Sequence, residues 1–352
     1  MKPLNALTLA VAALAAGVAR ADTAISWYPS VLSAYNWYSP QVFFDAQAGL
    51  YKMYFGGRTT QAQSYDSIYY SVSADSINWS TPQEILNPAV VQAKFRAWTT
   101  GDSQAEPFKS MTIDEVNDPF VTKHFNTTNN QYQYTMFFTA CINGCGVQSN
   151  NRIWSMTSVD GINFDFPQPA KISGEGVNVW AAQPSALVVA GTDGAAFWYV
   201  YHENRNPANG ADHKAYLTKV TGARTAIAGV SPQAVFTETR GNGAGQVSAV
   251  NVVQRGSQWD LIFNQYMPND ITNVYRVSSA SKTSWTGAST AVIANNNSPY
   301  CATLTPSAVP VSSTQYILFT SLITYNPNPP AGTSKCDFWH NQSISRFVIN
   351  AQ

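Results

Sequence analysis

Three carboxyl groups of the 352-residue chain stand in sequence settings that suit proton transfer or nucleophilic attack. Asp118 directly precedes a proline and an apolar run, and Glu203 is flanked by His202 and, two residues on, by Arg205. Glu175 lies between two glycines, which let a backbone approach a ligand closely. A carboxyl group acts as a general acid when burial or a neighbouring charge raises its pKa. We expect these three residues to be the catalytic candidates.

Each candidate also has a purely structural interpretation. Asp118 would then cap a turn before its proline, Glu203 would form a local ion pair on a surface loop, and Glu175 would belong to an ordinary loop. A further source of acids is the long connection over residues 87–117, because long loops in compact folds often serve as lids. It carries Trp98, Asp102, Glu106, Asp114 and Glu115, and the sequence does not choose among them.

Aromatic rings form a second group of candidates. Flat rings stack on the apolar faces of sugars while their polar edges form hydrogen bonds. Four rings lie at predicted loop or strand-start positions: Trp37, Tyr38, Trp98 and Trp180. The polar residues expected beside them are Ser39, Arg58, Gln183, His202 and Arg205. The alternative role for the rings is packing between sheets.

Composition limits the classes of partner. Charged residues make up 11% of the chain, well below the usual ~25%. The formal charge is zero, so nothing favours a polyanion and we do not expect a nucleic-acid partner. Low charge with many aromatic residues is typical of an extracellular β-protein that meets neutral sugars.

Residues 1–21 read as a signal peptide. Lys2 precedes the apolar run from Leu4 to Val18, and Ala19-Arg20-Ala21 forms a cleavage site. The mature chain would start at Asp22 with 18 basic residues, the 20 of the full chain minus two, against 20 acidic ones. The alternative is an uncleaved anchor, for which the run is short. We expect a secreted or periplasmic protein with no membrane span.

The four cysteines of the mature chain predict two disulfides in such a compartment. Three pairings are possible. We favour Cys141–Cys145 and Cys301–Cys336 because each pair then lies within one repeat. The four histidines are scattered, so we expect no metal site at the cysteines.

Five similar units follow one another along the chain. Each contains short runs rich in β-branched and aromatic residues, which predict strands. The runs are 39–44, 51–55, 67–72 and 84–86; 118–121, 132–138 and 152–156; 183–184, 197–201 and 216–220; 247–253, 259–263 and 274–277; 303–309, 316–320 and 344–349. One turn recurs as well, in 73–79 and 158–164 with a weaker copy at 279–285. We expect it to fold an aromatic side chain under its sheet.

A four-stranded sheet cannot bury both faces alone, and radial stacking of such sheets solves this. The sequence therefore predicts an all-β, five-bladed β-propeller as one domain over residues 22–352. The last unit lacks a fourth strand, which we expect residues 24–28 to supply. The alternative is a pair of β-sandwich domains.

With this blade pattern and Asn117-Asp118-Pro119, the chain resembles the five-bladed propeller glycoside hydrolases, the superfamily of arabinanases, β-xylosidases, invertases and levansucrases. The resemblance covers about residues 36–349. It implies a carbohydrate-binding pocket where the starts of the inner strands meet the loops between second and third strands. It also implies a glycoside hydrolase that acts on a plant or microbial polysaccharide or oligosaccharide. We expect no cofactor, and a bound calcium ion is an alternative that the sequence leaves open.

The resemblance implies an Asp in blade one, an Asp in blade two and a Glu in blade three. This chain has Ser39 and Gln183 at the first and third positions, and only Asp118 matches. In the arabinanase branch that position tunes pKa and orientation. Glu203 and Glu175 are the substitutes we expect. Two alternatives therefore stay open: a non-catalytic glycan-binding propeller, and a scaffold or adhesion module.

Overall fold

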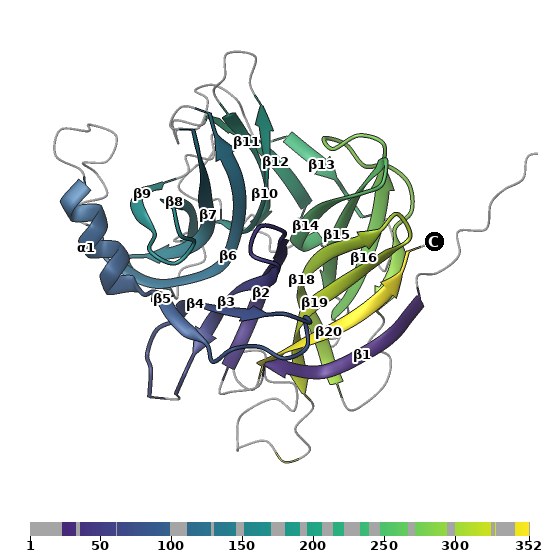
Figure 1. The fold of residues 1–352 in the computed structure, drawn as a ribbon, viewed down its shortest axis with the longest axis horizontal. Helices are drawn as coiled ribbons and strands as arrows, with labels where there is room; N and C mark the ends of the chain where they lie inside the picture. Colours follow the sequence, from purple (N-terminus) through teal and green to yellow (C-terminus); the bar gives the residue numbers. More distant parts are fainter. Residues whose placement is uncertain are drawn as a thin grey trace, which may run out of the picture.

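Five antiparallel blades of four strands surround one axis in the computed structural model (Figure 1), and one parallel bridge, Thr272 to Ala302, joins the last two blades into a single sheet. The structure describes residues 23–32, 36–60, 62–98, 111–127, 130–145, 151–169, 180–190, 196–205, 214–221, 233–238, 247–266, 272–293, 300–324, 328 and 342–351. The innermost strands β2, β6, β10, β14 and β18 ring the centre. The prediction of a five-bladed all-β propeller is confirmed.

The strands follow the predicted runs closely. Blade 1 contains β2 (Asn36–Asp45), β3 (Leu50–Arg58), β4 (Ser67–Ser73) and β5 (Gln83–Leu86). Blade 2 contains β6 (Ile113–Asn126), β7 (Gln131–Ile142), β8 (Asn151–Ser158) and β9 (Asp165–Pro169). Blade 3 contains β10 (Trp180–Ala190), β11 (Ala196–Arg205), β12 (Lys214–Thr221) and β13 (Gln233–Phe236). Blade 4 contains β14 (Val247–Arg255), β15 (Gln258–Tyr266), β16 (Thr272–Ser279) and β17 (Thr290–Ile293).

The two ends of the chain close the ring in blade 5. This blade contains β18 (Tyr300–Ser312), β19 (Gln315–Thr324) and β20 (Gln342–Asn350). Its fourth strand is β1 (Thr23–Leu32), which pairs antiparallel with β20, with Trp27 opposite Phe347 (Figure 1). The predicted closure by residues 24–28 is confirmed. The closing strand removes the exposed edge that three strands would leave.

Apolar clusters fill the spaces between neighbouring blades. Met53, Tyr54 and Phe55 follow one another along β3 and are all fully buried. Such a run is buried on both faces, because a middle strand has a neighbouring blade above and below it. The predicted turn contributes to these clusters, since Phe164 at its end is 1% exposed. Asp160 holds that turn by accepting the amide hydrogens of the two residues before Phe164.

Side chains of the inner strands join neighbouring blades around the axis. At one equivalent position, Gln41, Ser185, Asn251 and Ser307 each accept a hydrogen bond from a backbone N–H of the next inner strand. The four distances are 2.9–3.1 Å. Blade 2 has Phe120 at this position and makes no such link. These contacts fix the inner strands relative to one another, and therefore fix the residues at their ends.

The connection after blade 1 contains a helix that the sequence analysis missed. Helix α1 (Pro88–Trp98) is capped by Asn87, whose side chain accepts the N–H of Val90. Val91 and Phe95 are fully buried, and Phe95 packs edge-on against Trp154 of blade 2. Figure 1 shows α1 at the outside of the ring beside β5 and β9. This part of the connection therefore packs on the blades rather than covering the axis.

No helix among the described residues is long and apolar enough to cross a membrane.

Candidate functional site

One residue of each inner strand adopts a left-handed backbone conformation where the strand bulges. These residues are Ser39, Asp118, Gln183, Ala249 and Thr305, with φ between 47° and 52°. The register of every inner strand shifts at this point. All five line one narrow channel on the axis. Non-glycine residues with positive φ are uncommon, and their five-fold repetition shows that the bulge belongs to the architecture.

Asp118 and Ser39 meet across the boundary between blades 1 and 2. The Ser39 hydroxyl donates to Oδ1 of Asp118, and the Ser39 N–H donates to the Ser321 hydroxyl at 2.8 Å. Both residues line the channel at the bulge of their strands. Gln183 lies in the same channel and accepts a hydrogen bond from Ser248 at 3.2 Å. The three positions singled out by the resemblance are therefore brought together, with one acid among them.

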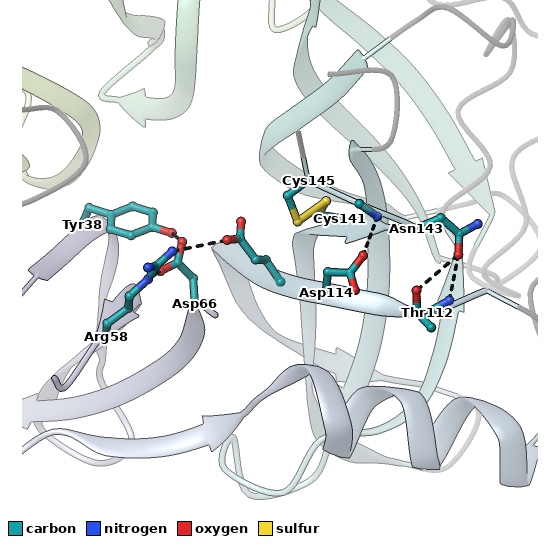
Figure 2. The surroundings of a disulfide bond; sticks show 10 residues. Tyr38, Arg58, Asp66, Thr112, Asp114, Cys141, Asn143 and Cys145 are labelled. Atoms are coloured by element: carbon teal, nitrogen blue, oxygen red, sulfur yellow. Dashed lines mark hydrogen bonds and ion pairs between the residues drawn. A yellow bond between two sulfur atoms is a disulfide. The ribbon is translucent and has the colours of Figure 1, made fainter. Parts of the chain in front are cut away.

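A charged network lies beside Asp118. Tyr38 donates to Oδ2 of Asp66 at 2.6 Å, and Nε of Arg58 donates to Oδ1 of the same carboxylate at 2.5 Å. A terminal nitrogen of Arg58 lies 3.3 Å from Oε1 of Glu115. Figure 2 shows Tyr38, Arg58 and Asp66 pointing toward one another. The network combines residues of β2, β3, the turn before β4 and the start of β6.

Glu115 is the residue of this network whose pKa lies near neutrality. Burial, followed by the negative charges of Asp66, Asp114 and Asp118, raises its pKa from 4.5 to about 7, against the lowering effect of Arg58. Its side chain is 22% exposed, so solvent or a ligand still reaches it. A carboxyl group with this pKa is partly protonated at neutral pH and can donate a proton.

Tyr38 stays protonated beside these acids. Burial, and then the charges of Asp66, Asp118 and Glu115, raise the pKa of its hydroxyl well above the usual value. The phenol therefore donates a hydrogen bond to Asp66, as Arg58 also does. The cluster holds three carboxyl groups against one guanidinium, an arrangement that favours protonation of one carboxyl group.

A disulfide holds the strand that carries Glu115. Cys141 of β7 is paired with Glu115 in the sheet and forms a disulfide with Cys145. The N–H of Gly144, inside this small loop, donates to Asp114 at 2.5 Å (Figure 2). The Cys141–Cys145 prediction is confirmed. Cys301 is also disulfide-bonded, while Cys336 lies outside the described residues.

Asp114, Cys141 and Cys145 come close enough together to resemble a metal-ligand set. Both sulfur atoms are committed to the disulfide. Thiolate ligation requires free, deprotonated cysteines, so this group does not fit a metal.

Two residues predicted to face a sugar are buried instead. Trp37 is 3% exposed and packs edge-on against Phe55 and Tyr69. His202 is fully buried, and its Nε2 lies 3.0 Å from the Thr218 hydroxyl. Both expectations are corrected. Trp37 belongs to an apolar cluster between blades, and the ring of His202 stacks on Tyr216, so neither side chain is available to a sugar.

For some of the other predicted residues the structure describes the backbone alone, and the rest lie outside the described residues. Trp180 and Arg205 are paired across β10 and β11, as are Ala182 and Glu203, and these strand ends lie on the same side as Gln183. Trp98 ends α1. Glu175, Asp102 and Glu106 fall outside the described residues.

Asp66 is the functional candidate that sequence reasoning missed. It follows a polar turn without a repeating pattern, and its 10% exposed side chain is placed by long-range contacts. Its main-chain oxygen accepts the N–H of Val116, at 3.3 Å, which joins the turn to β6. Glu115 was one of five residues considered in the long connection and is singled out by its surroundings alone.

The sequence matches no protein-family model and no curated protein. Solved structures do resemble the fold. The α-L-arabinofuranosidase of Lactobacillus brevis is 13% identical with a TM-score of 0.58, over 89% of this chain and 91% of that one. The catalytic domain of the Coprinopsis cinerea α-L-arabinofuranosidase is 10% identical with a TM-score of 0.56, over 89% and 90%.

A third structure contains a bound ligand. The α-L-arabinanase of Cellvibrio cellulosa, complexed with arabinohexaose, is 9% identical with a TM-score of 0.56, over 89% of this chain and 92% of that one. At such identities the likeness concerns the fold. The chain therefore has the five-bladed β-propeller fold that is also found in these glycoside hydrolases.

Proposed function

We propose that this protein is a secreted glycoside hydrolase whose active site lies at the channel mouth between blades 1 and 2. The observation that carries the proposal is the pairing of two acids there. Asp118 lies at the bulge of β6 and lines the channel, and Glu115, three residues earlier on the same strand, has a pKa near 7. Glycoside hydrolysis needs one protonated and one ionised carboxyl group. The arabinan-acting proteins of the same fold support a pentose-containing polysaccharide as substrate.

Glu115 is the general acid of this proposal. A proton donor works best when its pKa lies near the working pH, and Glu115 meets that condition because burial and neighbouring carboxylates disfavour its ionised form. It would protonate the glycosidic oxygen as the bond to the sugar carbon breaks. Arg58, 3.3 Å away, would then stabilise the carboxylate that remains.

Asp118 is the second carboxylate, acting as base or nucleophile. Its hydrogen bond from Ser39 fixes the direction of the carboxylate. Asp66 accepts hydrogen bonds from Tyr38 and Arg58, and its negative charge helps to raise the pKa of Glu115. Glu203 and Glu175 remain proposed substitutes for this second role, with Trp180, Gln183 and Arg205 as proposed sugar contacts.

Secretion is part of the proposal. The disulfide at Cys141–Cys145 and the bonded state of Cys301 suit an oxidising compartment. The leader over residues 1–21 would deliver the mature chain there.

The test is a screen for reducing-sugar release from arabinan, xylan and fructan. We expect one of them to be cleaved, and Asp118→Asn and Glu115→Gln to lower the rate at least about 100-fold. Glu203→Gln and Glu175→Gln are assayed in parallel, and Asp165→Asn, an exposed acid of the outer strand β9, is the control. Unchanged rates in both Asp118→Asn and Glu115→Gln would remove this pair from the mechanism.

A non-catalytic glycan-binding propeller is the second candidate. Ser39 and Gln183 favour it, because both occupy channel positions with uncharged groups. That function predicts binding of an arabino-oligosaccharide without cleavage of any substrate in the screen. Binding would then be weakened by Tyr38→Ala and insensitive to pH around 7 in Glu115→Gln.

A further inference from the structure

A second cavity opens on the axis at the end opposite the Asp118 site. Its volume is about 480 Å³, within the range of small-molecule sites. Residues 41–47 of the β2 segment and 120–123 of β6 line it. Both segments come after Ser39 and Asp118 along β2 and β6, and those strands start at the end of the axis where the Asp118 site lies. The cavity and the Asp118 site therefore lie at opposite ends of the propeller.

Two amide groups supply hydrogen-bond donors where this cavity meets the channel. Gln41 and Asn251 line both spaces. Their side-chain oxygens accept backbone N–H groups of the next blades, at 3.1 and 3.0 Å. Neither amide nitrogen has a partner among the described residues. The inter-blade contacts fix these side chains at the cavity wall and leave their amide N–H groups available as donors.

The cavity is also positively charged. Asp45 is the one acid among its described lining residues. That carboxylate is already bound by Lys123 at 2.8 Å, Lys52 at 2.9 Å and Tyr134 at 3.0 Å. Lys282 lines the cavity as well, and no acidic side chain of the described chain pairs with it. One ammonium group is therefore left for an anion.

Aromatic rings surround that ammonium group and the cavity mouth. The Lys282 nitrogen lies 5.7 Å from the ring centre of Trp259 and 5.6 Å from that of Tyr199. Phe44 and Tyr132, also lining residues, are 47% and 51% exposed. Exposed rings beside fixed donors are the features with which proteins hold a sugar ring, whose apolar face stacks while its oxygens accept hydrogen bonds.

We propose that this cavity binds a uronic-acid unit of an acidic oligosaccharide. The carboxylate pairs with Lys282, the apolar face of the sugar ring stacks on Trp259, and ring oxygens accept from Gln41 and Asn251. A neutral sugar would leave the Lys282 charge unused, and a purely apolar ligand would leave both amides without acceptors. The proposal does not depend on the Asp118 site being catalytic.

Titration calorimetry on the mature protein tests this with galacturonic acid and its dimer, using galactose and benzoate as the neutral and the non-sugar comparison. We expect the uronates to bind at least about tenfold more tightly than galactose. Lys282→Met should abolish that difference, as expected for the loss of a direct ammonium–carboxylate contact. Trp259→Ala should weaken the uronates and galactose alike. Melting curves establish that both variants are folded.

Lys94→Met is the matched control, because Lys94 is a surface lysine of α1 paired with Asp165 at 2.5 Å. It should bind uronates as the wild type does, and so should Asp118→Asn, whose site lies at the other mouth. Absence of uronate binding at millimolar concentrations, or equal affinity in folded Lys282→Met, overturns the proposal. Benzoate binding as tightly as galacturonate overturns the assignment to a sugar acid.

Discussion

Replacing Glu115 with glutamine should change how the stability of the protein depends on pH. Folding raises the pKa of this carboxyl group from 4.5 to about 7, so the folded state favours the protonated form. Its stability contribution is fully present below pH 4.5 and is lost as the pH rises through 7. At 1.36 kcal/mol per pKa unit, ionisation in the folded state costs about 3 kcal/mol. Glutamine has nearly the same shape and does not titrate.

Urea unfolding of the wild type and Glu115→Gln between pH 4.5 and 8.5 measures this effect. We expect the free energy of unfolding of the variant, relative to the wild type, to rise by about 3 kcal/mol across that range. Glu84→Gln, at an exposed glutamate of β5, serves as the control and should show no such rise. A constant difference between wild type and Glu115→Gln would refute the assignment of a raised pKa, and with it the role of Glu115 as acid.

Three further changes test the scaffold. Asp45→Asn should destabilise the protein by about 3–5 kcal/mol in urea, because two lysines then lose their buried counter-charge; a loss below 1 kcal/mol would contradict the inter-blade ion pair. Gly161→Ala places a Cβ 2.9 Å from a tyrosine hydroxyl at φ +79° and should cost about 1–3 kcal/mol. Gly49→Ala, which also has positive φ but open space around it, should melt at a higher temperature than Gly161→Ala, and equal melting points would exclude the clash. The double change Cys141→Ser, Cys145→Ser should cost about 2 kcal/mol, since the disulfide closes a short loop; an unchanged urea midpoint would count against this stabilisation.

Sequence reasoning was most successful for the blades. Strand runs and the Asp160 turn are local patterns, and each predicts its element without knowledge of distant contacts. The closing strand was inferred from the repeat, because the last unit lacked a fourth strand. The helix at Pro88–Trp98 also had local signals, namely Asn87 as cap, a proline at the first position and apolar residues four apart. It was missed because the segment was taken as a loop.

The site was only partly predictable. Tyr38, Ser39, Arg58 and Asp118 were expected together, because strand starts and returning loops gather at one end of the axis. Trp37 was expected at the pocket because, like Tyr38, it lies at the start of a strand. Neighbouring side chains of a strand point to opposite faces, and Trp37 packs against Phe55 and Tyr69.

The charged network was beyond the reach of local patterns. Asp66 joins it through a turn that contacts the next blade, and the pKa of Glu115 depends on charges contributed by separate elements. Neither the position of Asp66 nor the raised pKa of Glu115 has a signature in the neighbouring sequence.

The most direct test of Glu115 as the general acid compares kcat/KM on two substrates that contain the same sugar. One is the oligosaccharide found in the screen, and the other is an aryl glycoside with an acidic leaving group. A leaving group that departs as an anion does not need the proton of a general acid. We predict that Glu115→Gln lowers kcat/KM at least about 100-fold on the oligosaccharide and less than about tenfold on the aryl glycoside. Asp118→Asn should lower both equally. Equal losses on the two substrates in Glu115→Gln, or full activity on the oligosaccharide, would contradict the proposed acid and its site.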